Sequence, residues 1–307
     1  MPLAQAAAPK VIGILNAYHP RDVRESLDLF DRAMLTLGYA KGTHYVTIER
    51  MASGRNELLR GMAEELVRSN VDLIHAAPSN AVEEAQRATS TVPIVFVAVT
   101  DPVAEGFADS LAHPGRNLTG VSNNVGDLGP KRLQLLKLMV PGLTRLALLV
   151  TPRTPTFPTF LPRFRLNASA LGCETLLVEA PLPLDLAMAF NEMARAQCQA
   201  IYVAGDPYLW SERRHLADLA LQHRLPTVFA FVEHVEAGGL ISYGSDQKDW
   251  MRQSASFVDK IFRGSKPGEL PIEQPSKFDL FVNRRTANEL KIPIPSVLAL
   301  QATRVID

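Results

Sequence analysis

The chain has 307 residues, 47% of them hydrophobic, and its 32 basic residues balance its 32 acidic ones. This length leaves room for two globular domains of about 150 residues each. The balanced charge and the lack of a basic stripe argue against nucleic acid as a partner. No apolar run reaches the roughly 18 residues that a membrane-spanning helix needs.

The first ten residues, MPLAQAAAPK, lack the basic and apolar regions of an intact signal peptide. Ala4-Gln5-Ala6 nevertheless resembles an A-x-A cleavage site placed just before the first expected strand. The segment is therefore either the start of a mature exported protein or an Ala-rich disordered tail.

The first half alternates short apolar runs with segments of helical periodicity. Pro78 breaks one apolar run, and Ser79 can cap the helix that follows it. We expect strands at 10–15, 45–50, 71–76, 92–99 and 118–121, helices at 20–37, 56–69 and 81–88, and a short helix or turn at 103–112.

The second half repeats this alternation and adds elements at its end. We expect Pro158 and Pro162 to make the first turns of one helix irregular. Strands are expected at 145–150, 174–179, 200–204, after Pro226 and at 278–282; helices at 126–139, 157–171, between 207 and 225, at 247–262 and at 286–290; and the IPIPS stretch as a rigid coil into the end.

The two halves resemble each other. STVPIVFVA in the first and HRLPTVFAF in the second occupy equivalent places about 130 residues apart, and both follow a strand, a turn and a helix. Near-continuous apolar strands joined by helices predict parallel sheets covered on both faces. The predicted fold is therefore α/β, with two doubly wound lobes.

The surplus helix and strand near the end imply three crossings of the chain between the lobes. We expect lobe 1 to comprise residues 10–122 and 245–276, and lobe 2 residues 123–244 and 277–307. Three connecting segments would form a hinge about which the lobes close.

Cys173 and Cys198 each stand just before an expected strand, at the edge opposite to the one where α/β proteins bind ligands. We expect two buried structural thiols. Strand 145–150 should separate the two cysteine-bearing strands, which argues against a disulfide. A catalytic pair, as in a racemase, is the alternative.

Ligands of doubly wound sheets bind at the carboxyl ends of the strands. Hydroxyl, amide and aromatic side chains dominate there, and Glu233 also follows one strand. The candidate ligand-binding residues are Asn16, Ala17, Tyr18, Ser79, Asn80, Thr100, Asp101, Ser122, Asn123, Thr151, Arg153, Asp206, Tyr208, Phe231 and Tyr243.

These strand ends lack the motifs of catalysts and cofactor binders. GxSxG, a P-loop, a GxGxxG after the first strand, CxxC and HExxH are all missing from the chain. His75 lies in the middle of a strand, where we expect a core histidine. We therefore predict no catalytic residue, no metal and no cofactor.

Two positions suit opposite charges. Backbone N–H groups at Ser79 and Asn80 can hold a carboxylate at a helix start, although an ordinary serine N-cap is the alternative. Asp206 can accept an ammonium group, or simply cap the helix that follows it. Together they suit a zwitterion, whose side chain Tyr18, Tyr208, Phe231 and Tyr243 could cover.

Nearly the whole chain, from Lys10 to Ile306, resembles the solute-binding proteins of ABC transporters, in the branch of tryptophan- and tyrosine-type binders. The segments that carry the resemblance are LGYAKGTHYVTIER, ELVRSNVDLIHAA, ATSTVPIVFVAVTDPVAEGF, HPGRNLTGVSN, KRLQLLKLMVPGLTRLALL, RHLADLALQHRLPTVFAFVEHVEAGGLISYG and KPGELPIEQPSKFDLFVNRRTANELKI.

The resemblance implies a type I periplasmic-binding-protein fold and a periplasmic or otherwise extracytoplasmic monomer. It also implies that a small solute is captured between the lobes and delivered to a membrane permease. Many relatives carry Asn-Pro-x-Asn-Pro where this chain has Thr151-Pro-Arg-Thr-Pro155. Arg153 could therefore reach an acidic ligand, which leaves aromatic acids and other carboxylates open beside an apolar amino acid.

Two other functions share the doubly wound fold. A ligand-sensing domain of a repressor would need a helix-turn-helix, for which we see no segment before Lys10. An enzyme would need an acid–base pair, and Asp101 with Asp206 is the best available. We expect neither, because no motif supports them.

Overall fold

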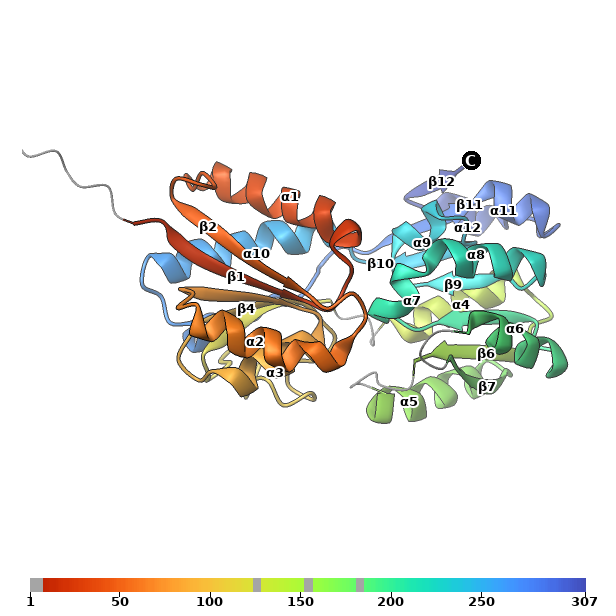
Figure 1. Ribbon diagram of the computed structural model, residues 1–307. Coiled ribbons are helices and arrows are strands. Elements are labelled where there is room, and N and C mark those ends of the chain that lie inside the picture. The colour runs from red at the N-terminus through yellow and green to blue at the C-terminus, as the bar shows by residue number, and fades with distance from the viewer. Residues whose placement is uncertain (1–7, 124–127, 152–156, 181–184) are drawn as a thin grey trace, which may run out of the picture. The chain divides into compact units, whose positions relative to one another are not determined.

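The computed structural model describes residues 8–123, 128–151, 157–180 and 185–307. The chain forms two compact units (Figure 1). Unit 1 comprises Met1–Asn123 and Gln247–Pro275, and unit 2 comprises Asn124–Asp246 and Ser276–Asp307. The chain therefore passes from one unit to the other three times.

Unit 1 is built on a five-stranded sheet in the order β2-β1-β3-β4-β5, in which every neighbouring pair is parallel. The central strands are buried on both faces, which explains their continuous apolar composition. The strands are β1 (Lys10–Asn16), β2 (Tyr45–Met51), β3 (Leu73–Ala77), β4 (Ile94–Val99) and β5 (Leu118–Ser122).

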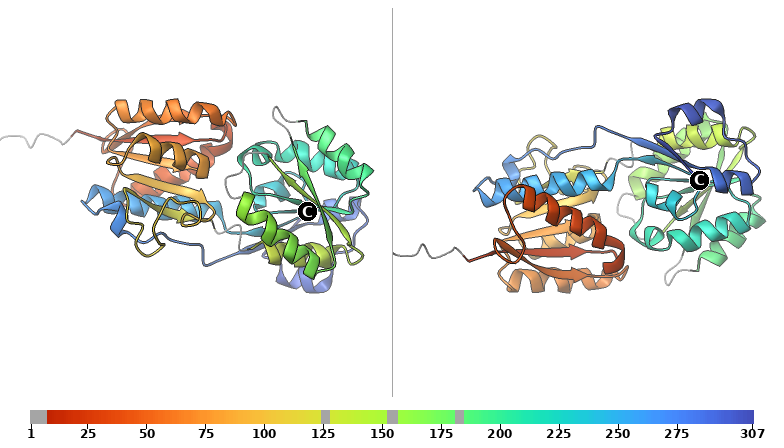
Figure 2. Two further views of the ribbon diagram at one scale, coloured as in Figure 1. Left: turned by 90° about the horizontal axis from the view of Figure 1, so that it is seen from below. Right: turned by 90° about the horizontal axis from the view of Figure 1, so that it is seen from above.

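Helices cover both faces of this sheet (Figures 1 and 2). Apolar residues of α1 recur every three or four positions, at Val23, Leu27, Phe30 and Met34, and all four are buried. On one face lie α1 (Pro20–Thr36) and α10 (Gln247–Phe262), which pack against each other; on the other lie α2 (Leu59–Arg68), preceded by the short helix η1 (Asn56–Leu58), and α3 (Ser79–Ala88).

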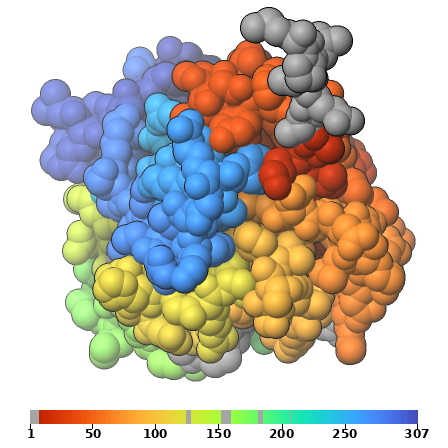
Figure 3. Space-filling view, turned by 90° about the vertical axis from the view of Figure 1, so that its left-hand side faces the viewer, coloured from red at the N-terminus to blue at the C-terminus, as the bar shows by residue number. Residues whose placement is uncertain are grey.

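Helix α10 belongs to unit 1 although it follows most of unit 2 in the sequence. His75, in the middle of β3, is buried and its Nε2 lies 3.1 Å from the hydroxyl of Ser254 on α10. His75 is thus the core histidine that the sequence predicts. The segment after α10, which contains η2 (Pro267–Glu269), pairs with the loop before β5, where Gly115 N–H donates to the Gly268 carbonyl. Figure 3 shows this blue segment beside the yellow loop.

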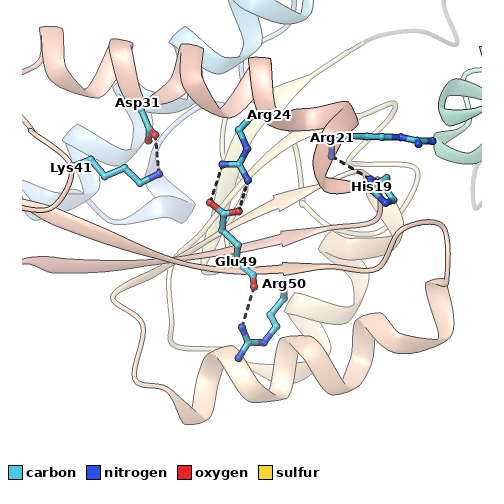
Figure 4. A network of polar contacts seen from close by, with 7 residues as sticks. All are labelled: His19, Arg21, Arg24, Asp31, Lys41, Glu49 and Arg50. Carbon is cyan, nitrogen blue, oxygen red and sulfur yellow. Dashed lines mark hydrogen bonds and ion pairs between the residues drawn. The ribbon is translucent and has the colours of Figure 1, made fainter.

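Ion pairs join α1 to the edge strand β2 and to the segment before it (Figure 4). Arg24 donates to both carboxylate oxygens of Glu49, at 3.0 and 3.5 Å, and Lys41 pairs with Asp31 at 2.8 Å. These side chains are partly exposed at the surface, so each pair contributes about 0–1 kcal/mol. Charges on an edge strand also discourage pairing with a second chain.

Unit 2 contains a seven-stranded sheet in the order β12-β11-β10-β9-β8-β6-β7. Its strands are β6 (Arg145–Val150), β7 (Glu174–Glu179), β8 (Ala200–Val203), β9 (Thr227–Phe229), β10 (Ile241–Gly244), β11 (Asp279–Asn283) and β12 (Arg304–Ile306). Strand β11 is antiparallel to β10, so the expectation of a purely parallel sheet is wrong for this strand. The chain re-enters unit 2 at Ser276, and β11 begins only a few residues later.

Helices cover both faces of this sheet as well. Leu133, Phe164 and Leu298 belong to the core on one face, and Phe190 and Leu216 to the core on the other. The first face carries α4 (Gly129–Met139), α5 (Phe157–Ala170), α11 (Arg284–Glu289) and α12 (Ser296–Gln301); the second carries α6 (Leu186–Arg195), α7 (Pro207–Ser211) and α8 (Arg213–Gln222), with α9 (Val232–Glu236) beside α8.

Two local expectations for unit 2 need correction. The IPIPS stretch is coil over residues 292–295 as predicted, but the chain does not continue as coil, because α12 then buries Leu298 and β12 adds to the sheet beside β11. Helix α5 is a single helix from Phe157 to Ala170 with Pro162 inside it. Proline there removes one backbone hydrogen bond, and packing of Phe164 in the core compensates for this loss.

The two cysteines are free thiols and both are buried. Strand β6 lies between β7 and β8, the strands that follow Cys173 and Cys198. The predicted separation of the two residues is confirmed, and burial raises the pKa of the Cys198 thiol. Within the described residues, no helix is long and apolar enough to cross a membrane.

Candidate functional site

The predicted residues of unit 1 gather at one edge of its sheet. Strands β1, β3, β4 and β5 are neighbours and parallel, so their carboxyl ends lie side by side. The residues that end or follow these strands are Asn16, Ala17, Tyr18, Ser79, Asn80, Thr100, Asp101, Ser122 and Asn123.

The start of α3 is a candidate anion site at this edge. Pro78 is the N-cap and offers no side-chain hydrogen bond, so the alternative that Ser79 is an ordinary N-cap is wrong. Ser79 is instead the first helical residue and is buried. Within the described parts of the chain, the backbone N–H groups of Ser79 and Asn80 donate to no acceptor. Such N–H groups, together with the helix dipole, favour a negative charge.

A carboxyl group that sequence reasoning missed lies beside this helix start. Glu105 accepts a hydrogen bond from the Asp101 N–H at 3.0 Å, and burial raises its pKa. The nearby Ser79 hydroxyl favours the ionised form, yet Oε2 of Glu105 makes no hydrogen bond among the described residues. In the sequence, only the four-residue spacing between Asp101 and Glu105, which is typical of a capped turn, could have indicated that Glu105 lies at this edge.

The other side chains of unit 1 shape this edge through local contacts. Asn16 Oδ1 accepts from Tyr18 N–H at 2.9 Å, and the Ser122 hydroxyl donates to the Thr100 carbonyl at 3.0 Å. Asp101 Oδ1 accepts from the Ala104 N–H at 2.9 Å, which holds the turn after β4. Asp101 is therefore an exposed turn residue, which weakens its candidacy as a catalytic acid.

In unit 2, the structure brings Thr151 and Asp206 into direct contact. Thr151 follows β6, Asp206 follows the adjacent strand β8, and the Thr151 hydroxyl donates to Asp206 Oδ2 at 2.7 Å. Oδ1 accepts from the backbone N–H groups of Tyr208 and Leu209, at 2.8 and 3.1 Å. Asp206 is thus the N-cap of α7. A carboxylate offers about four acceptor positions, so capping and ligand binding are compatible.

Arg132 is a second residue of this edge that sequence reasoning missed. It lies in the first turn of α4 and is fully buried. Its Nε donates to the Tyr243 carbonyl at 2.6 Å, and Nη1 donates to the Tyr202 hydroxyl at 3.2 Å. Arg132 therefore joins α4 to the ends of β8 and β10. Its position in the sequence could have indicated this burial, because Arg132 lies four residues before Leu136 and so shares the buried face of the helix.

The aromatic candidates of unit 2 differ in their surroundings. Phe231 is buried as the N-cap of α9, whereas Tyr208 in α7 is partly exposed. The Tyr243 ring packs against Phe278, with centroids 6.2 Å apart, and borders the core. Arg153 lies outside the described residues.

A groove of about 530 Å³ on unit 1 is lined by residues of α3 and of the 105–117 segment, including Glu105 and Arg116, but by none of the predicted binding residues. Among the described residues, no cluster of His, Cys, Asp or Glu could hold a metal ion.

Comparison with known proteins identifies the family of the chain as a whole. The family model described as "ABC transporter substrate binding protein" matches residues 23–306. A tyrosine-binding protein of Clostridioides difficile is 21% identical over 281 residues, which cover 92% of this chain and 81% of that protein.

Solved structures show the same fold. A conserved domain protein of Vibrio cholerae is 24% identical with a TM-score of 0.90, and covers 97% of this chain and 100% of its own. A domain from Streptococcus pneumonia in complex with L-Trp is 23% identical with a TM-score of 0.88 and the same coverage. A periplasmic binding protein of Burkholderia mallei is 13% identical with a TM-score of 0.62, covering 86% of this chain and 80% of that one. The predicted fold of two α/β lobes is confirmed.

Proposed function

This chain belongs to the family of ABC transporter substrate-binding proteins, and we propose that its substrate is an aromatic amino acid. The family binds solutes for transport, and we propose no catalytic activity for this member. Two relatives support an aromatic substrate, a tyrosine-binding protein and a domain in complex with L-Trp.

The proposed substrate class rests on one observation. The carboxyl edge of one sheet has groups that favour an anion, and the carboxyl edge of the other sheet has a carboxylate that favours a cation. In unit 1, α3 presents N–H groups at Ser79 and Asn80 that donate to no acceptor among the described residues. In unit 2, Asp206 is a buried carboxylate, 7% exposed, held by Thr151. We propose that the helix start in unit 1 can take a carboxylate, and that Asp206 in unit 2 takes an α-ammonium group, which are the two charged groups of an amino acid.

Buried polar side chains at the edge of unit 1 also restrict which ligands can bind there. Asn16, Ser122 and Asn123 are buried at the strand ends of unit 1. A ligand that displaced their present hydrogen-bond partners without replacing them would bind poorly, because buried polar atoms need partners. Each unit also offers a partly exposed aromatic ring that suits contact with an aromatic side chain, Tyr18 in unit 1 and Tyr208 in unit 2.

We further propose that the protein works outside the cytoplasm and delivers its solute to the permease of an importer. A ligand that binds one conformation better shifts the population towards it, and the permease would recognise that conformation. Expression of the full gene followed by osmotic-shock fractionation tests the location. Recovery only in the cytoplasmic fraction would contradict it.

A thermal-shift screen tests the substrate. The panel contains tyrosine, tryptophan and phenylalanine, with alanine, glutamate and ribose as controls. A ligand that binds only the folded state stabilises it by about 2.7 kcal/mol at a hundredfold excess over its dissociation constant. We expect a rise in melting temperature with at least one aromatic amino acid. A rise with ribose or glutamate alone would overturn the proposed substrate class.

Two analogues test the roles of the two edges. Tyramine lacks the carboxylate, and 3-(4-hydroxyphenyl)propionate lacks the ammonium group. If both groups are recognised, each analogue should bind about tenfold or more weakly than tyrosine. Equal affinity of tyrosine and tyramine would remove the anion site at α3 from the proposal.

A further inference from the structure

A second acidic residue stands at the same edge of unit 2 as Asp206. Strands β8 and β9 are parallel neighbours, with Ile201 opposite Thr227 and Tyr202 opposite Val228. Asp206 follows β8, and Glu233 follows β9 as the second residue of α9. The two carboxyl groups therefore follow the carboxyl ends of adjacent strands.

One oxygen of the Glu233 carboxyl group has no hydrogen-bond partner among the described residues. This oxygen, Oε2, is closed to solvent, although the residue as a whole is only partly buried. The interaction that favours its ionised form most is a hydrogen bond from its own backbone N–H. Asp206, in contrast, has three donors from Thr151, Tyr208 and Leu209.

The charged groups that face Glu233 come from three elements. Arg213 of α8 attracts its negative charge, whereas Glu236 of α9 and Asp246, which follows β10, repel it. The guanidinium of Arg213 donates to the Trp210 carbonyl at 3.0 Å and stacks over the Trp210 ring at 4.4 Å. Arg213 thus acts on Glu233 through space and makes no hydrogen bond to it in the described structure.

The neighbouring His234 supplies no positive charge either. Both of its ring nitrogens are buried without a hydrogen-bond partner in the described structure, and the ring stacks on Phe229 with centroids 4.5 Å apart. Burial lowers the pKa of His234 to about 3, so it is neutral. The same burial raises the pKa of Glu233 to about 7. A carboxylate in such surroundings is stabilised when a cation with N–H donors arrives.

We propose that Glu233 is a second ligand-binding carboxylate of unit 2, which takes the ammonium group of the amino acid together with Asp206. This inference rests on the proposed function. An ammonium group has three donors, so it can bond two carboxylates at once. Binding would then require an ionised Glu233, and the affinity should rise between pH 6 and pH 8 with release of a proton below neutral pH.

Substitution of Glu233 tests the inference. Calorimetry with tyrosine or tryptophan, whichever the wild-type protein binds, is done at pH 6 and pH 8 on wild type, Glu233→Gln and Glu236→Gln. Glu236 lies one turn further along α9, is exposed, and serves as the matched control. We expect Glu233→Gln to lose about tenfold to a hundredfold in affinity at pH 8 and to lose the pH dependence. Glu236→Gln should bind like wild type at pH 8 and should keep a pH dependence, because it leaves the Glu233 carboxyl group in place.

Stability and an amine-free probe separate ligand binding from a structural role. Without ligand, Glu233→Gln should melt at a higher temperature than wild type at pH 8, because a buried unpaired charge is removed. It should also bind 3-(4-hydroxyphenyl)propionate as wild type does. Unchanged affinity for the amino acid, or equal losses for both probes together with lower stability, would overturn the inference.

The two proposals fail differently. If wild type binds no amino acid, the proposed function fails and the role of Glu233 with it. If wild type binds an aromatic amino acid and Glu233→Gln binds it equally well, the proposed function stands and only the role of Glu233 is wrong.

Discussion

Asp206 caps a helix and is proposed to bind the ligand, and two substitutions can separate these roles. It caps α7 through Tyr208 N–H and Leu209 N–H, and it is proposed to hold the ligand ammonium. Asp206→Asn keeps an oxygen that can accept both backbone bonds, and asparagine is as good an N-cap as aspartate. Its amide can also donate to the Thr151 hydroxyl. The free energy of unfolding should therefore fall by no more than about 1 kcal/mol.

Ligand binding should respond much more strongly to the same change. A hydrogen bond to a charged group contributes about 1.5–3 kcal/mol, so Asp206→Asn should weaken amino-acid binding by roughly tenfold to 150-fold. Asp206→Ala should also lose the cap, about 0.5–2 kcal/mol, and leave the hydroxyl of Thr151 without this acceptor, about 1–3 kcal/mol. Asp206→Ala should thus be less stable than wild type by about 1.5–5 kcal/mol.

Urea unfolding and calorimetry on the same samples decide between the roles. The expected pattern is that Asn and Ala variants lose affinity together but differ in stability. An Asp206→Asn protein that binds aromatic amino acids as tightly as wild type would show that Asp206 is only a helix cap. The anion site at α3 would be unaffected by that result.

Three further predictions concern buried charged or titratable groups. Burial lowers the pKa of His75 from 6.5 to about 4. Between these pH values the imidazole is protonated in the unfolded chain but not in the folded one, so the free energy of unfolding should fall by on the order of 3 kcal/mol between pH 6.5 and pH 4. Urea unfolding of His75→Gln over this range should show a smaller loss, and an unchanged slope would contradict the assignment. Burial raises the pKa of Glu105, so its contribution to stability decreases as the pH rises above its ordinary value. Glu105→Gln should therefore raise the melting temperature at pH 8 and tighten binding of carboxylate ligands at α3; weaker binding would show that Glu105 supports the site. Arg132→Lys cannot make both bonds to Tyr243 and Tyr202, so it should lose about 2 kcal/mol of stability, and an unchanged melting temperature would refute this role.

Sequence patterns predicted most elements of both units, because burial imposes a period of 3.6 residues on helices and continuous apolar composition on central strands. Helix α1 and strands β1, β3 and β4 lie within a few residues of their expected bounds. The segments predicted wrongly depend on distant partners. Strand β12 exists because β11 offers it an edge, and Pro162 stays helical because α5 packs on the sheet.

Part of the candidate site could likewise be predicted from the sequence, and part could not. The rule that ligands bind at the carboxyl ends of parallel strands indicated Asn16, Ser79 and Asp206 from the order of elements alone. Which groups meet there depends on packing between segments far apart in the sequence. Glu105 approaches α3 because the loop after β4 folds back on it, and Thr151 reaches Asp206 because β6 and β8 are neighbours.

Local composition therefore determined the alternation of strands and helices, the internal repeat and the resemblance to a family of solute-binding proteins. Tertiary structure decided which polar groups are buried and which of them have partners. Hydrogen bonding and burial depend on neighbours that a single segment does not contain, as with Arg132, which is paired in the core, and Glu233, whose Oε2 makes no hydrogen bond in the described structure. Only the tertiary structure therefore shows which charged groups are available to recognise a ligand.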